Sequence, residues 1–268
     1  TGPGSVVGDE IVASPGTHAI GFIGSTETGY KIAARAAGKA LLLEMGGNGP
    51  VVVLDDADID KAVEASVTAS FLCAGQSCTA GELFLVHEAV HDEFRDKVTE
   101  RAQEVRLGDP FDAATNMGPL NNEPVAAKMD EHVRDALDRG AELVAGGARV
   151  SGFPTQLYYE PTVLDRVSEE MEVARDQTFG PVVPIRTIRS EDEALATIEE
   201  SRTGSWRPCS RATSLGGFAS RKPRGPGGSM STRLRTTGRR ISPSAAAPAR
   251  AAGSAALAAA SPSTASPS

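Results

Sequence analysis

Two short stretches of the sequence carry residues that can do covalent chemistry. Cys78 lies between Gly75 and Gly81 in a run of small residues, which is typical of a thiol on a tight turn with space around it. Glu44 ends an apolar run and is followed, two residues later, by a pair of glycines. A thiol nucleophile and a carboxylate base on two glycine-rich turns form the pair that covalent catalysis uses.

A third stretch has the form of a phosphate-binding turn. Residues 18–23 predict a short buried strand, residues 24–29 a small polar turn, and residues 30–39 a helix. In that order, the turn and the N-terminus of the helix can receive a phosphate group. The spacing of Gly24 and Gly29 is a weak signal alone, because an ordinary strand–turn–helix connection explains it as well.

The remaining elements must position these stretches, and they alternate along the chain. We expect strands at 41–44, 50–54, 83–86, 143–144, 161–164 and 181–185. We expect helices at 59–72, 87–105, 124–139 and 190–200. Alternation of this kind predicts an α/β fold with a mostly parallel sheet.

Composition narrows the class of protein. The 268 residues are 40% hydrophobic, which supports a real core, and 4% aromatic, which argues against a stacking surface for single-stranded nucleic acid. No apolar run approaches the ~18 residues that a membrane helix needs. The three cysteines are an odd number and suggest a reducing compartment, so we expect a cytoplasmic protein. Because the chain opens without Met, we expect a fragment or a processed product.

The motifs occur together and in an order that resembles the NAD(P)-dependent aldehyde dehydrogenase superfamily. Residues 22–29 resemble its cofactor turn, 43–47 its glutamate signature and 75–81 its cysteine signature, and 178–182 add a weaker match. The resemblance covers about residues 1–200. It implies the last part of a Rossmann-like cofactor domain at 1–46 and an aldehyde dehydrogenase-like catalytic domain at 47–200.

The resemblance implies a role for each residue of the nucleophile and base pair. Cys78 would attack the aldehyde carbonyl to give a thiohemiacetal, and loss of hydride would leave a thioester. Glu44 would activate the water that hydrolyses the thioester, and the backbone N–H of Cys78 would help to hold the oxyanion. A free cysteine has a pKa of ~8.5, so little of it is thiolate at neutral pH.

The implied cofactor is NAD or NADP, and no metal is expected. The residues that would face the cofactor pyrophosphate are Gly24, Ser25, Thr26, Glu27, Thr28 and Gly29. Phe179 would lie near the nicotinamide ribose. Gln177 stands where the family usually has a glutamate that grips this ribose, and a neutral amide accepts hydrogen bonds more weakly than a carboxylate. We therefore predict weaker nicotinamide binding. Cys73, without partners spaced for a metal site, is expected to be a small buried residue.

The implied partners are a small-molecule aldehyde and, for the parent protein, further copies of itself. Neither nucleic acid nor a membrane is expected as a partner. The family's oxyanion asparagine and its adenosine-ribose lysine would lie upstream of Thr1, which departs from the family pattern.

The last part of the sequence, residues 201–268, differs from the rest. It contains 11 basic and no acidic residues, whereas residues 1–200 hold all 35 acidic and 16 basic ones. By composition we expect it to be disordered. Read one base out of register from near Ser201, it is compatible with the family's C-terminal motifs, such as Pro-Phe-Gly-Gly-Arg-Ala-Gly-Ser at 243–250. We interpret it as an out-of-frame tail, and its basic character as a by-product of GC-rich codons.

Two alternatives to a dehydrogenase stay open. One is a non-catalytic remnant of such an enzyme. The other is a thiol esterase that uses Cys78 without nucleotide, because acyl transfer does not require hydride chemistry.

Overall fold

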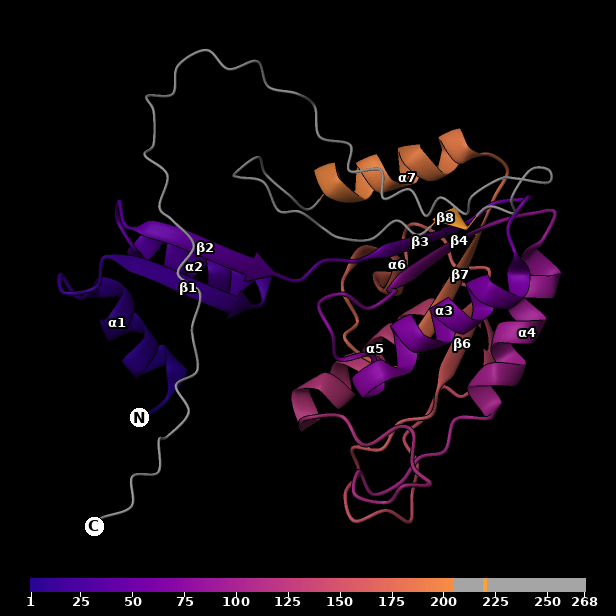
Figure 1. Ribbon diagram of the computed structural model, residues 1–268, viewed down its shortest axis with the longest axis horizontal. Coiled ribbons are helices and arrows are strands. Elements are labelled where there is room, and N and C mark those ends of the chain that lie inside the picture. The colour runs from indigo at the N-terminus through magenta and orange to yellow at the C-terminus, as the bar shows by residue number, and fades with distance from the viewer. Residues whose placement is uncertain (205–218, 221–268) are drawn as a thin grey trace, which may run out of the picture. The chain divides into compact units, whose positions relative to one another are not determined.

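The structure, a computed structural model, describes residues 1–204 and 219–220 (Figure 1). Its first part contains the helical turn η1 (Gly4–Gly8), the helices α1 (Asp9–Ala13) and α2 (Thr26–Arg35), and the strands β1 (Ala19–Gly24) and β2 (Ala40–Met45). The two strands are parallel, with Ile23 opposite Glu44. This part therefore supplies both the predicted phosphate turn and the predicted base.

Helix α2 begins at Thr26 rather than at the predicted Tyr30. The cause is an N-terminal cap, because the Ser25 side chain accepts a hydrogen bond from the Thr28 N–H at 3.3 Å. The helix ends at Arg35, and Ala37 and Gly38 follow with positive φ angles of 39° and 85°. Left-handed backbone at these positions stops the helix before the predicted end at Lys39.

The prediction that residues 18–23 form a buried strand is right in element type and wrong in burial. Within β1 only Ile20 is buried, where it joins Val12 and Ala36 in a small cluster beneath α1 and α2. Ile23 is 78% exposed. These helices cover one face of the β1–β2 pair, so side chains on the other face have no cover from the described residues.

The second sheet has six strands in the order β5-β6-β7-β4-β3-β8, and only the β5–β6 pair is antiparallel. The α/β fold with a mostly parallel sheet is thus confirmed. The strands are β3 (Pro50–Val53), β4 (Leu83–His87), β5 (Glu142–Ala145), β6 (Thr162–Asp165), β7 (Val182–Ile188) and β8 (Ala219–Ser220).

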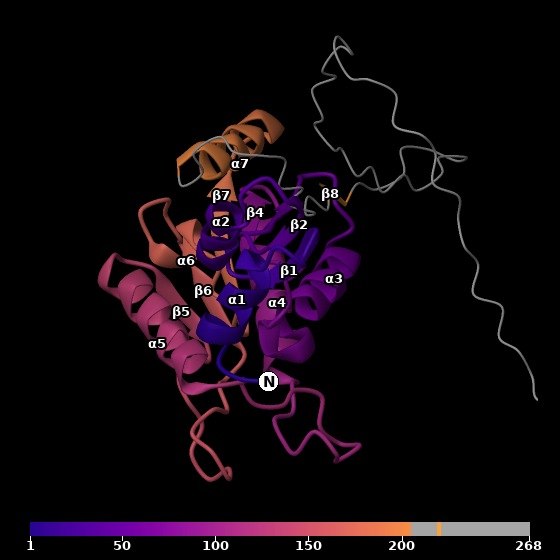
Figure 2. The ribbon, with the colours of Figure 1, turned by 90° about the vertical axis from the view of Figure 1, so that its left-hand side faces the viewer.

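Helices lie on both sides of this sheet. Figure 2 shows α5 on one side of β6 and β7, and α3 and α4 on the other. The helices are α3 (Ile59–Phe71), α4 (His91–Gln103), α5 (Glu123–Asp138), the short α6 (Glu172–Arg175) and α7 (Glu191–Gly204). Helix α4 begins later than predicted because β4 continues to His87, after which the Glu88 N–H bonds to Ile188 O at 2.9 Å.

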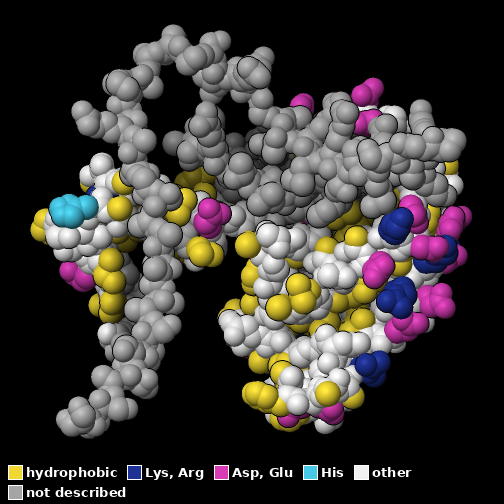
Figure 3. Space-filling view, in the orientation of Figure 1, with side chains coloured by type: hydrophobic (Ala, Val, Ile, Leu, Met, Phe, Trp, Pro, Cys, Tyr) yellow, Lys and Arg dark blue, Asp and Glu magenta, His cyan; other side chains and the backbone are white. Residues whose placement is uncertain are grey.

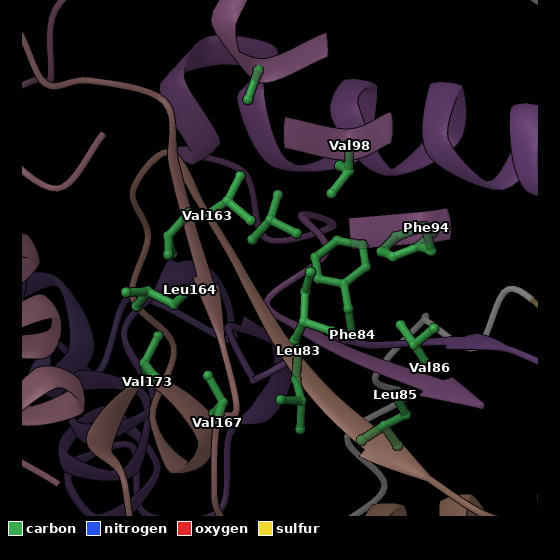
Figure 4. Close-up of a cluster of buried hydrophobic side chains, with 14 of the residues drawn as sticks. Leu83, Phe84, Leu85, Val86, Phe94, Val98, Val163, Leu164, Val167 and Val173 are labelled. Carbon is green, nitrogen blue, oxygen red and sulfur yellow. The ribbon is translucent and has the colours of Figure 1, made fainter. Parts of the chain in front are cut away.

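The core lies between β4 and its neighbouring elements. All four residues Leu83–Val86 are buried, which explains why this strand is a continuous apolar run. Figure 4 shows Phe84 directed toward Phe94 and Val98 of α4, and Leu85 directed to the other side of the strand. The rings of Phe84 and Phe94 are stacked with centroids 6.2 Å apart. Strand β4 is therefore packed on both faces.

Charged side chains cover the outer surface of the helical layer. Figure 3 shows acidic and basic side chains interspersed on the side where α4 lies. Lys97 of α4, for example, pairs with Asp60 at 2.6 Å and with Glu93 at 2.8 Å. No helix in the described part of the chain is both long and apolar enough to cross a membrane.

The two sheets meet at a short connection. The first sheet ends at Met45 and the second begins at Pro50. The predicted domain division at residue 46 stays a prediction. Of the predicted tail, 201–268, the structure describes the end of α7 and the two residues of β8; Cys209 and the motifs expected in the shifted frame lie outside the described residues.

Candidate active site

The backbone before Cys78 makes a left-handed turn. Cys73, Ala74 and Gly75 have φ angles of 53°, 55° and 72°, one after another. Left-handed backbone costs a non-glycine residue roughly 1–2 kcal/mol, so the first two positions are strained. Strain of this kind persists only where the surroundings hold it in place, and it concentrates at functional sites.

Hydrogen bonds hold this turn to the rest of the domain. The Gln76 side chain accepts from the Asn121 N–H at 2.8 Å and donates to Cys73 O at 2.9 Å. At the other end, the Ser70 hydroxyl of α3 donates to Gly81 O at 3.2 Å. The segment 76–81 is therefore fixed at both ends although it has no regular structure.

Cys78 lies on the outside of this turn. Its side chain is exposed, and neither its thiol nor its backbone N–H has a hydrogen-bond partner among the residues that the structure describes. A free N–H next to an accessible thiol can donate to an oxygen that develops negative charge on a carbon attached to the sulfur.

The expectation that Cys73 is buried is wrong. Its side chain is exposed, as is that of Cys78. Cys73 lies beyond the end of α3, at the first of three left-handed positions, so the face that this helix buries does not extend to it. Both thiols are therefore accessible from one surface turn.

The loop that contains Gln177 and Phe179 lies against residues 73–81, which we call the Cys78 turn. A Cβ atom at Gly75 would lie 2.1 Å from the carbonyl oxygen of Gly180, so the two backbones touch. Phe179 has a φ of 59°, which is a second strained position beside the same turn. The sequence predicted both segments as parts of one site, and the structure places them in contact.

The carboxyl of Glu82 joins this loop to the end of the Cys78 turn. Glu82 is 1% exposed, and its two oxygens accept the N–H groups of Thr178 at 3.0 Å and Phe179 at 3.2 Å. Burial raises the pKa of Glu82 to about 7, while these two N–H groups and the charge of Lys128 act in the opposite direction.

Two residues of α5 complete the surroundings of the loop. Lys128 donates to the backbone oxygen of Gln177, and His132 Nδ1 lies 3.0 Å from the hydroxyl of Thr178. His132 is buried; this burial and the nearby Lys128 charge lower its pKa to about 4, so its imidazole is neutral at neutral pH. Sequence reasoning missed Glu82, Lys128 and His132. Of these three residues, Glu82 is the one that the sequence could have singled out, because it is a charged residue directly before an apolar strand.

Glu44 lies on β2 with an exposed side chain. No hydrogen bond or ion pair links its carboxylate to Cys78 or to any other described residue. The segment that follows it does reach the site. The Gly49 carbonyl accepts the Glu82 N–H at 2.9 Å, and a Cβ atom at Gly46 would lie 2.0 Å from Gln177 Oε1.

The residues of the phosphate turn lie at the N-terminus of α2. Ser25 caps the helix, and the Thr26 hydroxyl donates to Gly46 O at 3.3 Å. Glu27 is paired with Lys31 at 2.6 Å. A Cβ atom at Gly29 would lie 2.3 Å from the sulfur of Met45, so a side chain at this position would require Met45 to move. The turn is thus attached to the same segment, 46–49, that contacts Gln177 and Glu82.

The contacts bring together some of the predicted residues and not others. The Cys78 turn, the 46–49 segment and the 177–180 loop touch one another, and the turn 24–29 joins through Thr26. The Glu44 carboxylate forms no hydrogen bond with the Cys78 thiol. Among the described residues, no group of three His, Cys, Asp or Glu side chains could hold a metal ion.

The chain is similar to characterised dehydrogenases. It is 37% identical over 207 residues to betaine aldehyde dehydrogenase of Bacillus subtilis (strain 168), a match that covers 76% of this chain and 42% of that protein. It is 36% identical over 207 residues to succinate-semialdehyde dehydrogenase [NADP(+)] of Escherichia coli (strain K12), with the same coverage of 76% and 42%.

The structure is similar to solved structures of the same kind. For betaine aldehyde dehydrogenase from Staphylococcus aureus in complex with NAD+, the TM-score is 0.70 at 33% identity, over 73% of this chain and 40% of that one. This chain thus spans about two fifths of the length of the relatives that it matches. The sequence model of the aldehyde dehydrogenase family matches residues 1–206. The chain belongs to the aldehyde dehydrogenase family.

Proposed function

We propose that the protein represented by this chain oxidises a small-molecule aldehyde to a carboxylic acid with NAD or NADP, with Cys78 as nucleophile and Glu44 as general base. One observation carries the proposal. The Cys78 turn, the segment after Glu44 and the Gln177–Phe179 loop are joined by contacts of the backbone and of the Gln177 side chain, although Gly46 and Gln177 are 131 positions apart in sequence. The family relatives named above act on aldehydes, which supports the same class of substrate here.

In the first half of the proposed reaction, the Cys78 thiolate attacks the aldehyde carbon. A carbon–sulfur bond forms, and the electron pair of the carbonyl moves to oxygen. The Cys78 N–H, which has no other acceptor among the described residues, is available to donate to this oxyanion. The oxyanion then collapses to a thioester as the aldehydic hydrogen leaves with its electron pair.

The residues present fit a dinucleotide at two points. The first N–H groups of α2, at Thr26 and Glu27, have no acceptor within the helix and favour an anion there. The Gln177 amide nitrogen is a buried donor without a well-formed hydrogen bond, although the amide lies beside the Glu82 carboxyl. NAD or NADP supplies the hydride acceptor when bound. Ser25, Thr28 and the glycines at 24 and 29 would shape the turn that holds its pyrophosphate, and Phe179 would flank its ribose.

In the second half, Glu44 takes a proton from water, and the resulting hydroxide attacks the thioester carbon. The carbon–sulfur bond breaks, the thiolate of Cys78 leaves, and the carboxylic acid is released. Catalysis by a positioned general base is typically worth ~10²–10⁴-fold. Since the Glu44 carboxylate is exposed and has no protein partner in the described residues, a water molecule can reach it.

The test compares two activities of the purified chain: formation of NADH or NADPH from an aldehyde, followed by absorbance, and hydrolysis of a nitrophenyl ester. Cys78→Ala should abolish both. Cys73→Ala is the matched control, since Cys73 is an exposed thiol of the same turn, and it should retain both. Glu44→Gln should slow deacylation more than acylation, whereas Glu64→Gln, at an exposed position of α3, should change neither.

The outcomes separate the proposal from its alternatives. Ester hydrolysis that depends on Cys78, without reduction of cofactor, would favour a thiol esterase. The absence of both activities in a folded chain would favour a non-catalytic remnant. Either activity surviving Cys78→Ala would show that the nucleophile is wrong. A cytoplasmic location and a homo-oligomeric parent remain predictions of the sequence.

A further inference from the structure

Glu82 is a buried carboxyl that the proposed reaction does not use. It lies four residues after Cys78 and is 1% exposed. A carboxyl is rarely buried unless partners compensate for the lost water. Its partners are the consecutive N–H groups of Thr178 and Phe179, at 3.0 and 3.2 Å, one to each oxygen.

The geometry of this contact explains the conformation of the loop. Consecutive backbone N–H groups that converge beside a left-handed residue form a concave anion site. Phe179 is that left-handed residue, with a φ of 59°. The Glu82 carboxylate therefore occupies an anion site formed by its own chain, and it stabilises a backbone conformation that an aromatic residue otherwise avoids.

Glu82 also connects the loop to the other two segments of the site. Its backbone N–H donates to Gly49 O at 2.9 Å, and Gly49 lies in the segment that follows Glu44. Its chain neighbours lead directly back to the Cys78 turn. One residue thus holds all three segments in register, through its carboxyl, its N–H and its position in the sequence.

The surroundings of the carboxyl determine how it responds to pH. Helix α5 faces it with the charge of Lys128, and the loop faces it with the neutral amide of Gln177. His132 of α5 bonds to Thr178, and burial holds its pKa at about 4 against the opposing charges of Asp176 and Asp135, so it does not change charge near neutrality. The pKa of Glu82 is about 7, so the charge of this carboxyl changes near neutrality.

We propose that Glu82 is a positioning residue of this site: its carboxyl, bonded to the N–H groups of Thr178 and Phe179, clamps the Gln177–Phe179 loop to the Cys78 turn. The role rests on the proposed function, because the loop it holds is the one expected to receive the nicotinamide ribose. A protonated carboxyl is a weaker acceptor for the two N–H groups, so both amides should report the protonation state of Glu82.

Nuclear magnetic resonance of the isotope-labelled, full 268-residue chain tests the clamp without cofactor or substrate. The side-chain carboxyl carbon of Glu82 and the amides of Thr178 and Phe179 are followed from about pH 5 to about pH 9. All three should titrate together with a midpoint near 7. In Glu82→Gln neither amide should show this titration. The hydrogen exchange of both amides, corrected for intrinsic rate, should rise at least about 10-fold.

Two variants serve as controls. Glu88→Gln changes an exposed carboxylate shortly after the same strand and should leave the amide titration intact. Lys128→Met removes the facing positive charge and should move the midpoint upward. Amides that do not titrate in the wild-type chain, or that still titrate near 7 in Glu82→Gln, would overturn the proposal.

This experiment separates the clamp from the proposed function. The wild-type titration requires no variant to fold and no activity. A chain without Cys78-dependent turnover, whose Thr178 and Phe179 amides nevertheless follow the Glu82 carboxyl, would disprove the proposed activity in this chain and support the clamp.

Discussion

The backbone of Gly75 approaches that of Gly180 so closely that a Cβ atom at position 75 would lie 2.1 Å from the Gly180 oxygen. Gly75→Ala should therefore destabilise the chain by about 2–5 kcal/mol, the sum of a left-handed backbone penalty and overpacking against the 177–180 loop. Urea unfolding of the variant and the wild-type chain measures this difference.

A second glycine separates the two causes. Gly140 also has a positive φ, 98°, but a Cβ there would meet no atom within 4 Å. Gly140→Ala should cost only the backbone part, about 1–2 kcal/mol. Equal losses for the two variants would mean that the contact between the Cys78 turn and the loop contributes nothing.

The exposure of Cys73 and Cys78 predicts the pattern of thiol labelling. Both side chains are accessible on one turn, so a small alkylating reagent should modify both residues in the folded chain. Peptide mass mapping after a short exposure measures the extent at each position. Protection of Cys73 alone would contradict its observed exposure and restore the sequence expectation that it is buried.

Gln177→Glu tests the expectation that an amide at this position weakens nicotinamide binding. At a pH where the carboxyl of Glu82 and the new carboxyl at position 177 are both ionised, the variant should bind NAD or NADP roughly 5-fold more tightly. The reason is that a charged acceptor is stronger than a neutral one by about 1 kcal/mol. Titration calorimetry measures the affinity. Gln156→Glu, at an exposed position, provides the control for added charge.

The same variant has a consequence for Glu82. The Gln177 amide lies beside this buried carboxyl, so a second carboxyl there places two like charges together and should raise the midpoint of Glu82 further. An unchanged midpoint would show that the two side chains do not interact. An unchanged cofactor affinity would contradict the role given to position 177.

The sequence predicted most helices and strands because their signals are local. The apolar run Leu83–Val86 is a buried strand, and the cap at Asp58 marks the start of α3. Burial of β1 was not predictable in the same way. Apolar residues in 18–23 indicate a strand, but which face is covered depends on where α1 and α2 lie, and the pattern does not encode that.

Residue types and spacing alone singled out Cys78 and Glu44 as a nucleophile and base pair, whereas the loop at 177–179 entered the candidate site only through the family resemblance. Nothing local marks Glu82 as their connection, since its two hydrogen bonds span 96 and 97 residues of sequence. The exposure of Cys73 depends on three consecutive left-handed residues, two of which are not glycine. Such conformations are imposed by tertiary contacts and leave no signal in the residue types.

Glu82 and His132 should give the stability of the chain opposite dependences on pH. Folding raises the pKa of Glu82 from 4.5 to about 7, so the stability that its neutral form contributes is complete below 4.5 and is lost as pH rises through 7. Folding lowers the pKa of His132 from 6.5 to about 4, so its contribution is complete above 6.5 and is lost as pH falls through 4. Each of these two contributions to stability amounts to about 3 kcal/mol.

Between about pH 4.5 and 6.5 the two slopes oppose each other, so these groups should leave the wild-type free energy of unfolding nearly constant. Each single variant should reveal the other group. Glu82→Gln should lose stability as pH falls from 6.5 toward 4, and His132→Gln should lose it as pH rises from 4.5 toward 7. The urea midpoints of the wild-type chain and the two variants, measured across this pH range, test both expectations. Parallel pH profiles for all three chains would contradict the opposing burial of these two groups, because a common slope would have to come from elsewhere in the molecule.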